Sequence, residues 1–465
     1  MTKLAPAAAV AADGDLYLAA PKIYPRETDG LFQGLRRTAM FVLLGLYYLL
    51  PWLSWNGRQA VLFDLPARKF HVLGLTFWPQ DFFYLSWLLI LAGLSLFFFT
   101  ALAGRLWCGY ACPQTVWTEA FLWVERLFEG DRGRRMKLDA APWGREKLAR
   151  KGGKQATWIA LALWTGFTFV GFFTPIRELG PRVLTLSLGP WETFWTLFYA
   201  FATYGNAGHL REQVCKYMCP YARFQGAMFD PSTLIIAYDA ARGEPRGSRR
   251  KGSDYKAAGL GDCIDCTFCV QVCPTGIDIR DGLQYECIAC GACIDACNAV
   301  MDKVAYPRGL IRYATEDSLA ARPSKILRPR VVVYFLLLAA GFGAFAWSVA
   351  HRLPLQVDVV RDRNALYRVA SDGAIENAYT LKIMNKGHES RRYRVTLEDE
   401  GPVGFAGREP VEAEVASGEV LALPVTLRAA AGAVAGRAEV EFVVAAADAP
   451  DIRYEAESRF FGPTP

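Results

Sequence analysis

Five long apolar stretches stand out along the chain. A helix needs roughly 20 apolar residues to cross the hydrocarbon core of a bilayer, and four of the five stretches approach that length. The fourth is the weakest because threonines dilute it, although its many aromatic residues keep it apolar. The pattern therefore predicts an α-helical membrane protein with five transmembrane helices, at residues 38–55, 82–103, 156–174, 191–204 and 331–350.

Beyond residue 351 the long stretches give way to short alternations of apolar and polar residues. Turn-forming sequences such as Ser371-Asp-Gly and Asn385-Lys-Gly separate these runs. About seven short strands in roughly 110 residues are typical of a small β-sandwich. The expected strands cover residues 356–360, 380–384, 393–397, 413–415, 420–427, 438–444 and 453–460.

The lysine and arginine positions orient the predicted helices, because loops that stay in the cytoplasm carry an excess of these residues. Arg36 and Arg37 precede the first stretch, and further basic residues crowd positions 105–154, 246–251 and 325–330. The loops after the first and third stretches are much less basic. We therefore expect the N-terminus and residues 243–330 in the cytoplasm, and residues 351–465 in the periplasm.

The composition agrees with a membrane protein. Of the 465 residues, 52% are hydrophobic, and the net charge of +6 is modest. The basic runs flank apolar segments instead of alternating with aromatic residues, so they give no case for nucleic-acid binding. The alanine-rich start lacks the apolar core of a signal peptide. We therefore expect residues 1–37 to form a cytoplasmic tail that is disordered at its start.

Eight of the twelve cysteines fall between Cys263 and Cys297, in two runs of identical spacing. Each run reads Cys-x2-Cys-x2-Cys-x3-Cys. In two-cluster ferredoxins the fourth cysteine of each run ligates the other cluster. We therefore assign one [4Fe–4S] cluster to Cys263, Cys266, Cys269 and Cys297, and the other to Cys287, Cys290, Cys293 and Cys273.

Zinc and disulfides are the alternatives for these eight thiols. Zinc sites usually pair two Cys-x2-4-Cys clips across a longer gap, and disulfides need an oxidising compartment. Pro274 follows the fourth cysteine of the first run, whereas Asn298 stands at that place in the second. This departure matters little because the proline is not a ligand. We expect an inserted bacterial-type ferredoxin module of the α+β class at residues 243–330, tethered by a flexible linker at residues 243–261.

The remaining four cysteines form a repeated Cys-x3-Cys-Pro signature, called CxxxCP below. It follows the second and the fourth predicted helix, so residues 38–242 are interpreted as a four-helix membrane domain built from a duplicated hairpin. A spacing of four places both sulfurs on one face of a helix, which the proline then ends or bends. Together Cys108, Cys112, Cys215 and Cys219 could offer four thiolates to copper(I), zinc or an iron–sulfur centre.

Other roles for this region stay open. The four thiols could instead be buried packing residues or a dithiol/disulfide pair. His209 lies shortly before Cys215 and could reach the same metal, although a lone interfacial histidine is more often structural. Met218, inside the second signature, is a candidate soft ligand, with packing as the more ordinary role.

These motifs resemble those of the cytochrome c oxidase accessory proteins of the CcoG/FixG/RdxA type. The resemblance rests on Tyr24-Pro-Arg26, on Asp64-Leu-Pro-Ala-Arg-Lys-Phe-His71 with Phe77-Trp-Pro-Gln-Asp81, on both CxxxCP regions and on the ferredoxin core. It covers nearly the full length of the chain. It implies an immunoglobulin-like fold for residues 351–465.

The resemblance also implies a function, a multi-pass protein of the bacterial inner membrane that reduces Cu(II) to Cu(I) for assembly of cbb3-type cytochrome c oxidase. The four CxxxCP cysteines would be the catalytic, copper-handling thiols, and the two [4Fe–4S] clusters would carry the electrons. Thiolates favour Cu(I) over Cu(II), which agrees with that direction. The implied partners are an unidentified cytoplasmic electron donor and oxidase subunits or copper-delivery proteins, and a homo-oligomer is left open.

Two other functions fit the same residues. The chain could be a membrane ferredoxin that relays electrons to another redox partner, with a further iron–sulfur centre at the CxxxCP pairs. It could also be a non-enzymatic assembly factor whose sandwich docks oxidase subunits.

Overall fold

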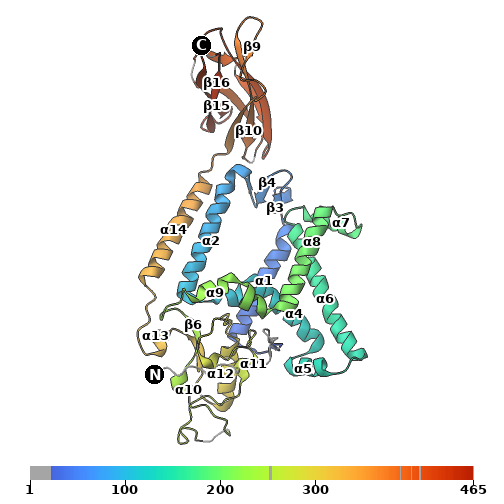
Figure 1. Cartoon of the computed structure of the whole chain (residues 1–465), viewed down its shortest axis with the longest axis vertical. Coiled ribbons are helices and arrows are strands. Elements are labelled where there is room, and N and C mark those ends of the chain that lie inside the picture. The colour runs from blue at the N-terminus through green and yellow to red at the C-terminus, as the bar shows by residue number, and fades with distance from the viewer. Residues whose placement is uncertain (1–21, 251–253, 388, 399–400, 408–409, 464–465) are drawn as a thin grey trace, which may run out of the picture. The chain divides into compact units, whose positions relative to one another are not determined.

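The computed structural model describes residues 22–250, 254–387, 389–398, 401–407 and 410–463. The chain divides into two compact units, Met1–Ala340 and Gly341–Pro465. Figure 1 shows the elements of both, and each unit is described by itself.

Helices occupy all five places where the apolar stretches predicted them. They are α1 (Leu31–Leu49), α2 (Phe82–Ala103), α6 (Arg145–Val170), α8 (Pro190–Thr203) and α14 (Pro329–Ala350). Within the described residues, two helical segments are long and apolar enough to cross a membrane, Pro79–Ala103 and Pro329–Ala350. Both expose large apolar side chains such as Ile90 and Leu336, as a bilayer would require. Five spans therefore remain a prediction.

The other three helices differ from the expected spans for local reasons. Helix α1 begins before Arg36 and ends at Leu49, because a 3-10 turn, η1 (Leu50–Trp52), contains Pro51. Helix α6 starts in the basic loop and reaches only Val170. Helix α8 has 14 residues, a length of about 21 Å. It continues into a π-helical turn, η3 (Tyr204–Leu210).

Small sheets connect α1 to α2, and the apolar pattern did not predict them. The hairpin β1 (Ser54–Trp55) and β2 (Arg58–Gln59) is followed by an antiparallel sheet of β3 (Val61–Asp64), β4 (Lys69–Val72) and β5 (Leu75–Phe77). A 3-10 turn, η2 (Pro79–Asp81), then leads into α2.

Shorter helices around the two CxxxCP signatures complete the helical part of the first unit. They are α3 (Leu106–Tyr110), α4 (Pro113–Glu129), α5 (Arg132–Ala140), α7 (Ile176–Leu184), the π-helical turn η4 (Val214–Met218) and α9 (Pro220–Gly226). Helix α14 begins beside the end of α2. The Arg328 guanidinium binds the Asp230 carboxylate and the Ala101 carbonyl, and the Phe97 and Tyr334 rings lie 6.2 Å apart.

The ferredoxin module starts earlier than residue 243. Strand β6 (Ile235–Tyr238) pairs antiparallel with β7 (Ile311–Ala314). Residues 235–238, which were predicted to belong to the membrane domain, are therefore part of the ferredoxin module. The remaining elements are α10 (Ala240–Gly243), α11 (Phe268–Gln271), the 3-10 turn η5 (Ile279–Asp281), α12 (Ala292–Val304) and α13 (Glu316–Leu319).

The segment expected to be a flexible linker packs on the module. The Gly247 N–H donates to the Cys263 carbonyl at 3.2 Å, and the Gly261 N–H donates to the Pro245 carbonyl at 2.9 Å. The Arg249 guanidinium also binds the Cys263 carbonyl. The linker prediction is therefore wrong for the described part of this segment, while residues 251–253 lie outside the described residues.

The described part of the predicted N-terminal tail also packs against the rest of the unit. The Arg26 N–H donates to the Gln271 carbonyl at 2.8 Å, and the Tyr24 hydroxyl donates to Asp139 at 2.6 Å. Residues 1–21 lie outside the described residues, and α1 begins at Leu31. Residues 22–37 are therefore part of the folded unit and not a tail.

The first turn of α1 is capped by the ferredoxin module. The Asp295 carboxylate, on α12, accepts hydrogen bonds from the Gln33 N–H at 2.8 Å and the Phe32 N–H at 3.4 Å. Gly30 leaves room for that carboxylate, because a Cβ at Gly30 would lie 2.3 Å from the Asp295 Cγ. The cap fixes the module to the start of the first helix.

We expect Asp295→Ala to weaken this docking. Losing an N-cap carboxylate typically costs about 1 kcal/mol, and here the cap joins two parts of the unit. In detergent, the variant should lose its iron–sulfur absorbance at a lower temperature than the unaltered chain. Asp302→Ala is the matched control on the same helix, because Asp302 makes only a surface ion pair with Arg308. Equal melting of the two variants would contradict the capping role.

The second unit contains a sandwich of two antiparallel sheets. One has the order β12-β14-β10-β8 with β9 paired to β10, and the other has the order β13-β11-β15-β16. The side chains of Leu381, Tyr393 and Phe442 are fully buried between them. All seven predicted strands are confirmed, and β9 and β12 are additional. The strands are β8 (Leu355–Arg361), β9 (Arg368–Val369), β10 (Ile375–Asn385), β11 (Arg391–Leu397), β12 (Val403–Phe405), β13 (Val411–Val415), β14 (Val420–Ala429), β15 (Arg437–Ala446) and β16 (Arg453–Phe461).

Candidate redox site

The two cysteine runs of the ferredoxin module fold into the same loop. In both, the residues on either side of the second cysteine have left-handed backbone conformations. These are Asp265 and Thr267 in the first run, with φ of 53° and 56°, and Ala289 and Gly291 in the second, with φ of 52° and 75°. Such conformations bend the chain around a centre, and they are strained for the non-glycine residues. Helices α11 and α12 then begin at equivalent places.

The eight thiols line two cavities. Four of them surround the first thiol cavity, whose other walls include Ile311 and Leu310. The second thiol cavity is walled by isoleucines such as Ile236 and Ile288. The first cavity takes three cysteines from the first run and one from the second, and the second cavity takes three from the second run and two from the first. The first is lined by Cys263, Cys266, Cys269 and Cys297, and the second by Cys273, Cys287, Cys290 and Cys293, with Cys269 also reaching the second.

The donor chemistry of these cavities fits [4Fe–4S] clusters. Burial raises the pKa of the Cys269, Cys297 and Cys287 thiols to about 12, and it raises the pKa of Cys290 and Cys293 as well. A thiolate in such surroundings is costly unless a positively charged centre compensates it. Four thiols around an apolar cavity are the ligand set that an iron–sulfur cluster requires.

The two cavities differ in their access to solvent. Cys266 is exposed, and its neighbours Asp265 and Thr267 are exposed too. In the second cavity, Cys290 is buried, and the rest of the first unit covers the Cys287–Cys290 loop. A soluble electron donor could therefore approach the first thiol cavity more closely than the second.

The two CxxxCP signatures share one local geometry. The first cysteine of each lies in a short helical turn, Cys108 in α3 and Cys215 in η4. The second cysteine is extended and forms the N-cap of the next helix, Cys112 for α4 and Cys219 for α9, with the proline at the first helical position. The expectation that both sulfurs lie on one helical face is wrong, because the turn ends before the second cysteine. Proline is well suited to begin a helix and unsuited to continue one.

The four CxxxCP thiols lie near enough for the charge of one to affect the ionisation of another, although no three of their sulfurs lie within 4.8 Å of one another. Burial raises the pKa of Cys108 to about 12, and ionised Cys112, Cys215 or Cys219 would raise it further. Burial likewise raises the pKa of Cys215 to about 11. Burial also raises the pKa of Cys112, whereas the N–H groups of Thr115 and Gln114 at the start of α4 act in the opposite direction. The site, called the CxxxCP thiols below, offers the sulfur ligands that a soft metal prefers.

The first signature is pressed against the second thiol cavity. A Cβ at Gly109 would lie 2.8 Å from the carbonyl oxygens of Ile288 and Ala289 and 3.0 Å from the Cys290 Cα. The Tyr110 hydroxyl donates to the Cys290 carbonyl at 3.2 Å. The Cys108 side chain packs against the same loop. The cysteine spacing did not predict the role of Gly109, although glycine is the residue that lets a backbone approach another group closely.

The lesser candidates lie elsewhere. The His209 ring is 4.9 Å from the Tyr204 ring and 5.9 Å from the Trp158 ring, which indicates packing against aromatic residues. The Met218 side chain is 60% exposed.

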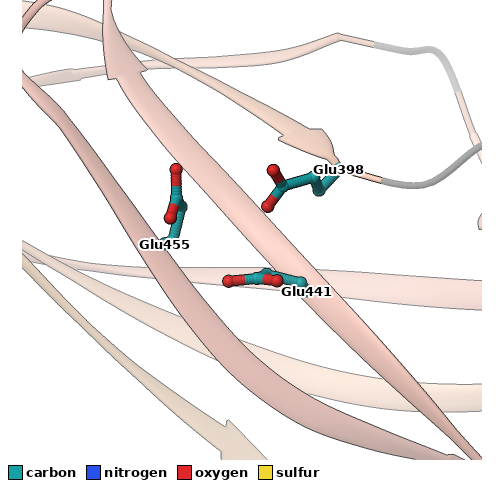
Figure 2. Close-up of side chains that lie close together, drawn as sticks. All are labelled: Glu398, Glu441 and Glu455. Atoms are coloured by element: carbon teal, nitrogen blue, oxygen red, sulfur yellow. The ribbon is translucent and has the colours of Figure 1, made fainter.

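The second unit contains an acidic cluster. Figure 2 shows the carboxylates of Glu398, Glu441 and Glu455 facing one another, and their ligand oxygens lie within 4.8 Å. Partial desolvation and the charges of the other two raise the pKa of Glu441. Arg453 forms an ion pair with Glu455 at 2.6 Å. The group lies at the surface, and nothing else in it points to a ligand.

Three family models match the chain. A "4Fe-4S dicluster domain" matches residues 210–316, which hold the second signature and all eight ferredoxin cysteines. A "4Fe-4S binding domain" matches residues 84–135, which hold the first signature. A model described as an "IG-like fold at C-terminal of FixG" matches residues 345–463, so the sandwich is immunoglobulin-like. The chain is therefore an iron–sulfur redox protein.

Curated relatives match most of the chain. It is 41% identical to "Nitrogen fixation protein FixG" of Rhizobium meliloti, over 83% of this chain and 80% of that protein. It is 41% identical to "Protein RdxA" of Cereibacter sphaeroides, over 85% of both chains. It is 40% identical to "Protein RdxB" of the same organism, over 91% of this chain and 92% of that protein. At this identity and coverage, the chain belongs to the FixG family.

Proposed function

We propose that this protein is a membrane-bound iron–sulfur oxidoreductase that reduces Cu(II) to Cu(I) for assembly of cbb3-type cytochrome c oxidase. Copper is the substrate in this proposal, and the CxxxCP thiols bind it. Because thiolates hold Cu(I) more tightly than Cu(II), four of them favour the reduced product.

One observation carries the proposal: the contact between the first signature and the second thiol cavity. The backbone at Gly109 touches the Ile288–Cys290 loop, and Tyr110 binds the Cys290 carbonyl. Four thiols suited to a soft metal thus lie directly beside the ligands of an iron–sulfur cluster. Copper bound by the CxxxCP thiols would therefore lie close to a cluster in the second thiol cavity.

The eight ferredoxin cysteines would hold two [4Fe–4S] clusters, which supply one-electron transfer at low potential. The role of the protein chain is to hold the two clusters next to each other. Cys269 lines both cavities and keeps them adjacent. The exposed Cys266 leaves the first cavity open to a cytoplasmic donor, and the buried walls of the second exclude water from the exit side.

The membrane arrangement belongs to the same proposal. Five helices would cross the bacterial inner membrane, with the ferredoxin module in the cytoplasm and the immunoglobulin-like domain in the periplasm. The distribution of basic residues supports this orientation. Oxidase subunits or copper-delivery proteins would be the partners on the product side.

A single-turnover experiment tests the proposal. The purified protein is reduced without oxygen, freed of reductant and mixed with Cu(II) and a Cu(I)-specific chelator. A chain that holds two reduced clusters stores two electrons, so it should yield about two Cu(I) as its visible absorbance returns to the oxidised form. Clusters that stay reduced after Cu(II) is added, with no Cu(I) formed, would overturn the proposal.

A second function is favoured by the match of a "4Fe-4S binding domain" to residues 84–135. In that case the CxxxCP thiols would hold a third iron–sulfur centre, and the chain would relay electrons to another redox partner. Thiolates are ligands for both copper(I) and iron–sulfur centres, so the donor set is compatible with either role.

Iron counting separates these two functions. We expect roughly eight iron atoms per chain if two [4Fe–4S] clusters are present and roughly twelve if there are three. Replacing Cys112 and Cys219 by serine should leave the iron content unchanged if the CxxxCP thiols bind copper. A loss of about four iron atoms in that variant would favour the relay.

A further inference from the structure

Arg105 lies between the three cysteine-bearing segments of the redox site. It follows the end of α2, precedes Cys108 by three residues, and is only 5% exposed. Its position inside the protein, and not on the surface, requires groups that compensate its charge.

The Arg105 guanidinium binds backbone carbonyls from two of these segments. One terminal nitrogen donates to the Tyr285 carbonyl and, at 3.5 Å, to the Cys287 carbonyl. The other donates to the Ala222 carbonyl, on α9 directly after the second signature. Since Arg105 itself introduces the first signature, one side chain links both CxxxCP signatures to the loop of the second thiol cavity.

No carboxylate forms an ion pair with Arg105 among the described residues, and its Nε has no hydrogen-bond partner there. Other buried arginines differ in this respect. Arg36 pairs with Glu119 at 3.0 Å, and Arg135 pairs with Glu125 at 2.9 Å. A buried cation without a counter-ion is unfavourable. Its neighbours show which anions are available.

Those neighbours are thiols on both sides of the contact. Arg105 precedes Cys108, one of the CxxxCP thiols, by three residues. Its guanidinium also donates at 3.5 Å to the backbone carbonyl of Cys287, a cysteine of the second thiol cavity. The charge of Arg105 therefore reaches both halves of the site.

We propose that Arg105 is a positioning residue that serves as the shared counter-ion of the second thiol cavity and the CxxxCP thiols and raises the reduction potential of the cluster held in that cavity. One-electron reduction adds one negative charge to the cluster, so a buried cation at this place favours the reduced form. The inference rests on the proposed iron–sulfur ligation and not on copper as the substrate.

The test is a redox titration of the whole protein followed by EPR. In Arg105→Gln, the equilibrium constant for reducing one cluster should fall at least about tenfold, which is about 59 mV for a one-electron couple. The other cluster should keep its potential. Arg105→Lys keeps the charge without the planar fork, so it should restore most of the potential.

Arg280→Gln is the matched control. Arg280 lines the first thiol cavity and pairs with Asp265 and Asp278. Its replacement should shift the other EPR signal, which assigns the two signals to the two cavities.

Several results would overturn the inference. Unchanged potentials in Arg105→Gln at full iron content would do so, and so would an equal shift of both clusters. If Arg105→Gln loses iron, Arg105→Lys decides: equal loss would mean that shape and not charge matters. A selective shift together with no Cu(I) production by the unaltered chain would support the role of Arg105 and overturn copper as the substrate.

Discussion

The Cys215→Ser variant is expected to reduce Cu(II) at least about 100-fold more slowly than the unaltered chain while keeping both [4Fe–4S] clusters. Even residues that only support a metal's ligands cost 10–100-fold when replaced, and Cys215 is proposed as a ligand. Cys215 is preferred to Cys108 for this test because Cys108 packs against the loop of the second thiol cavity. The measurement is the rate of cluster reoxidation by Cu(II), with iron content and the EPR spectrum recorded for the same sample.

Met218→Leu is the control within the same signature. The substitution conserves volume, and the Met218 side chain is mostly exposed. We expect its copper reduction to equal that of the unaltered chain. Full activity in Cys215→Ser would remove the second signature from the mechanism, and a loss in Met218→Leu would show that the thioether is a ligand.

The second large effect is expected from Gly109→Ala, which adds one methyl group where two backbones touch. The new Cβ would lie 2.8 Å from two carbonyl oxygens and 3.0 Å from the Cys290 Cα. These atoms cannot turn away as a flexible side chain can. Overpacking of this kind typically costs about 1–3 kcal/mol, so the signature and the loop must move apart. We expect reoxidation by Cu(II) to slow at least about tenfold, because a misplacement of about 1 Å between reacting groups can cost up to about 100-fold in rate.

Gly226→Ala is the matched control for this substitution. Gly226 ends α9, which starts at the second signature, and a Cβ there would meet nothing within 4 Å. Alanine also favours a helix over glycine. Equal rates for Gly109→Ala and Gly226→Ala would mean that the contact at Gly109 is not needed for electron transfer.

The sequence predicted those parts of the structure that follow from a regular spacing of residues. Alternating apolar positions predicted all seven main strands of the sandwich, because each strand buries one face. The spacing of the cysteine runs predicted the four thiols proposed for each cavity, since in two-cluster ferredoxins the fourth cysteine of each run ligates the other cluster, although Cys269 also reaches the second cavity. Both signals are local and depend on few other residues.

The other features of the fold and the site depend on contacts between distant segments, which no spacing or periodicity in the sequence indicates. Strand β6 lies more than 70 residues before its partner β7, so the sequence alone places it in the predicted membrane domain. Arg105 reads as one more basic residue of a cytoplasmic loop, and only the fold shows that it is buried among carbonyls. The importance of Gly109 follows only from the fold, which brings the Ile288–Cys290 loop against its backbone.

The Asp295 cap on α1 also has a consequence for biosynthesis. The Gln33 N–H donates to a carboxylate that lies 262 residues further along the chain. Because translation proceeds from the N-terminus, α1 is made long before its cap exists, and contacts this distant form late. The first helix can therefore gain this cap only after the ferredoxin module has emerged from the ribosome and folded, so the start of the unit is completed by one of its last-made segments.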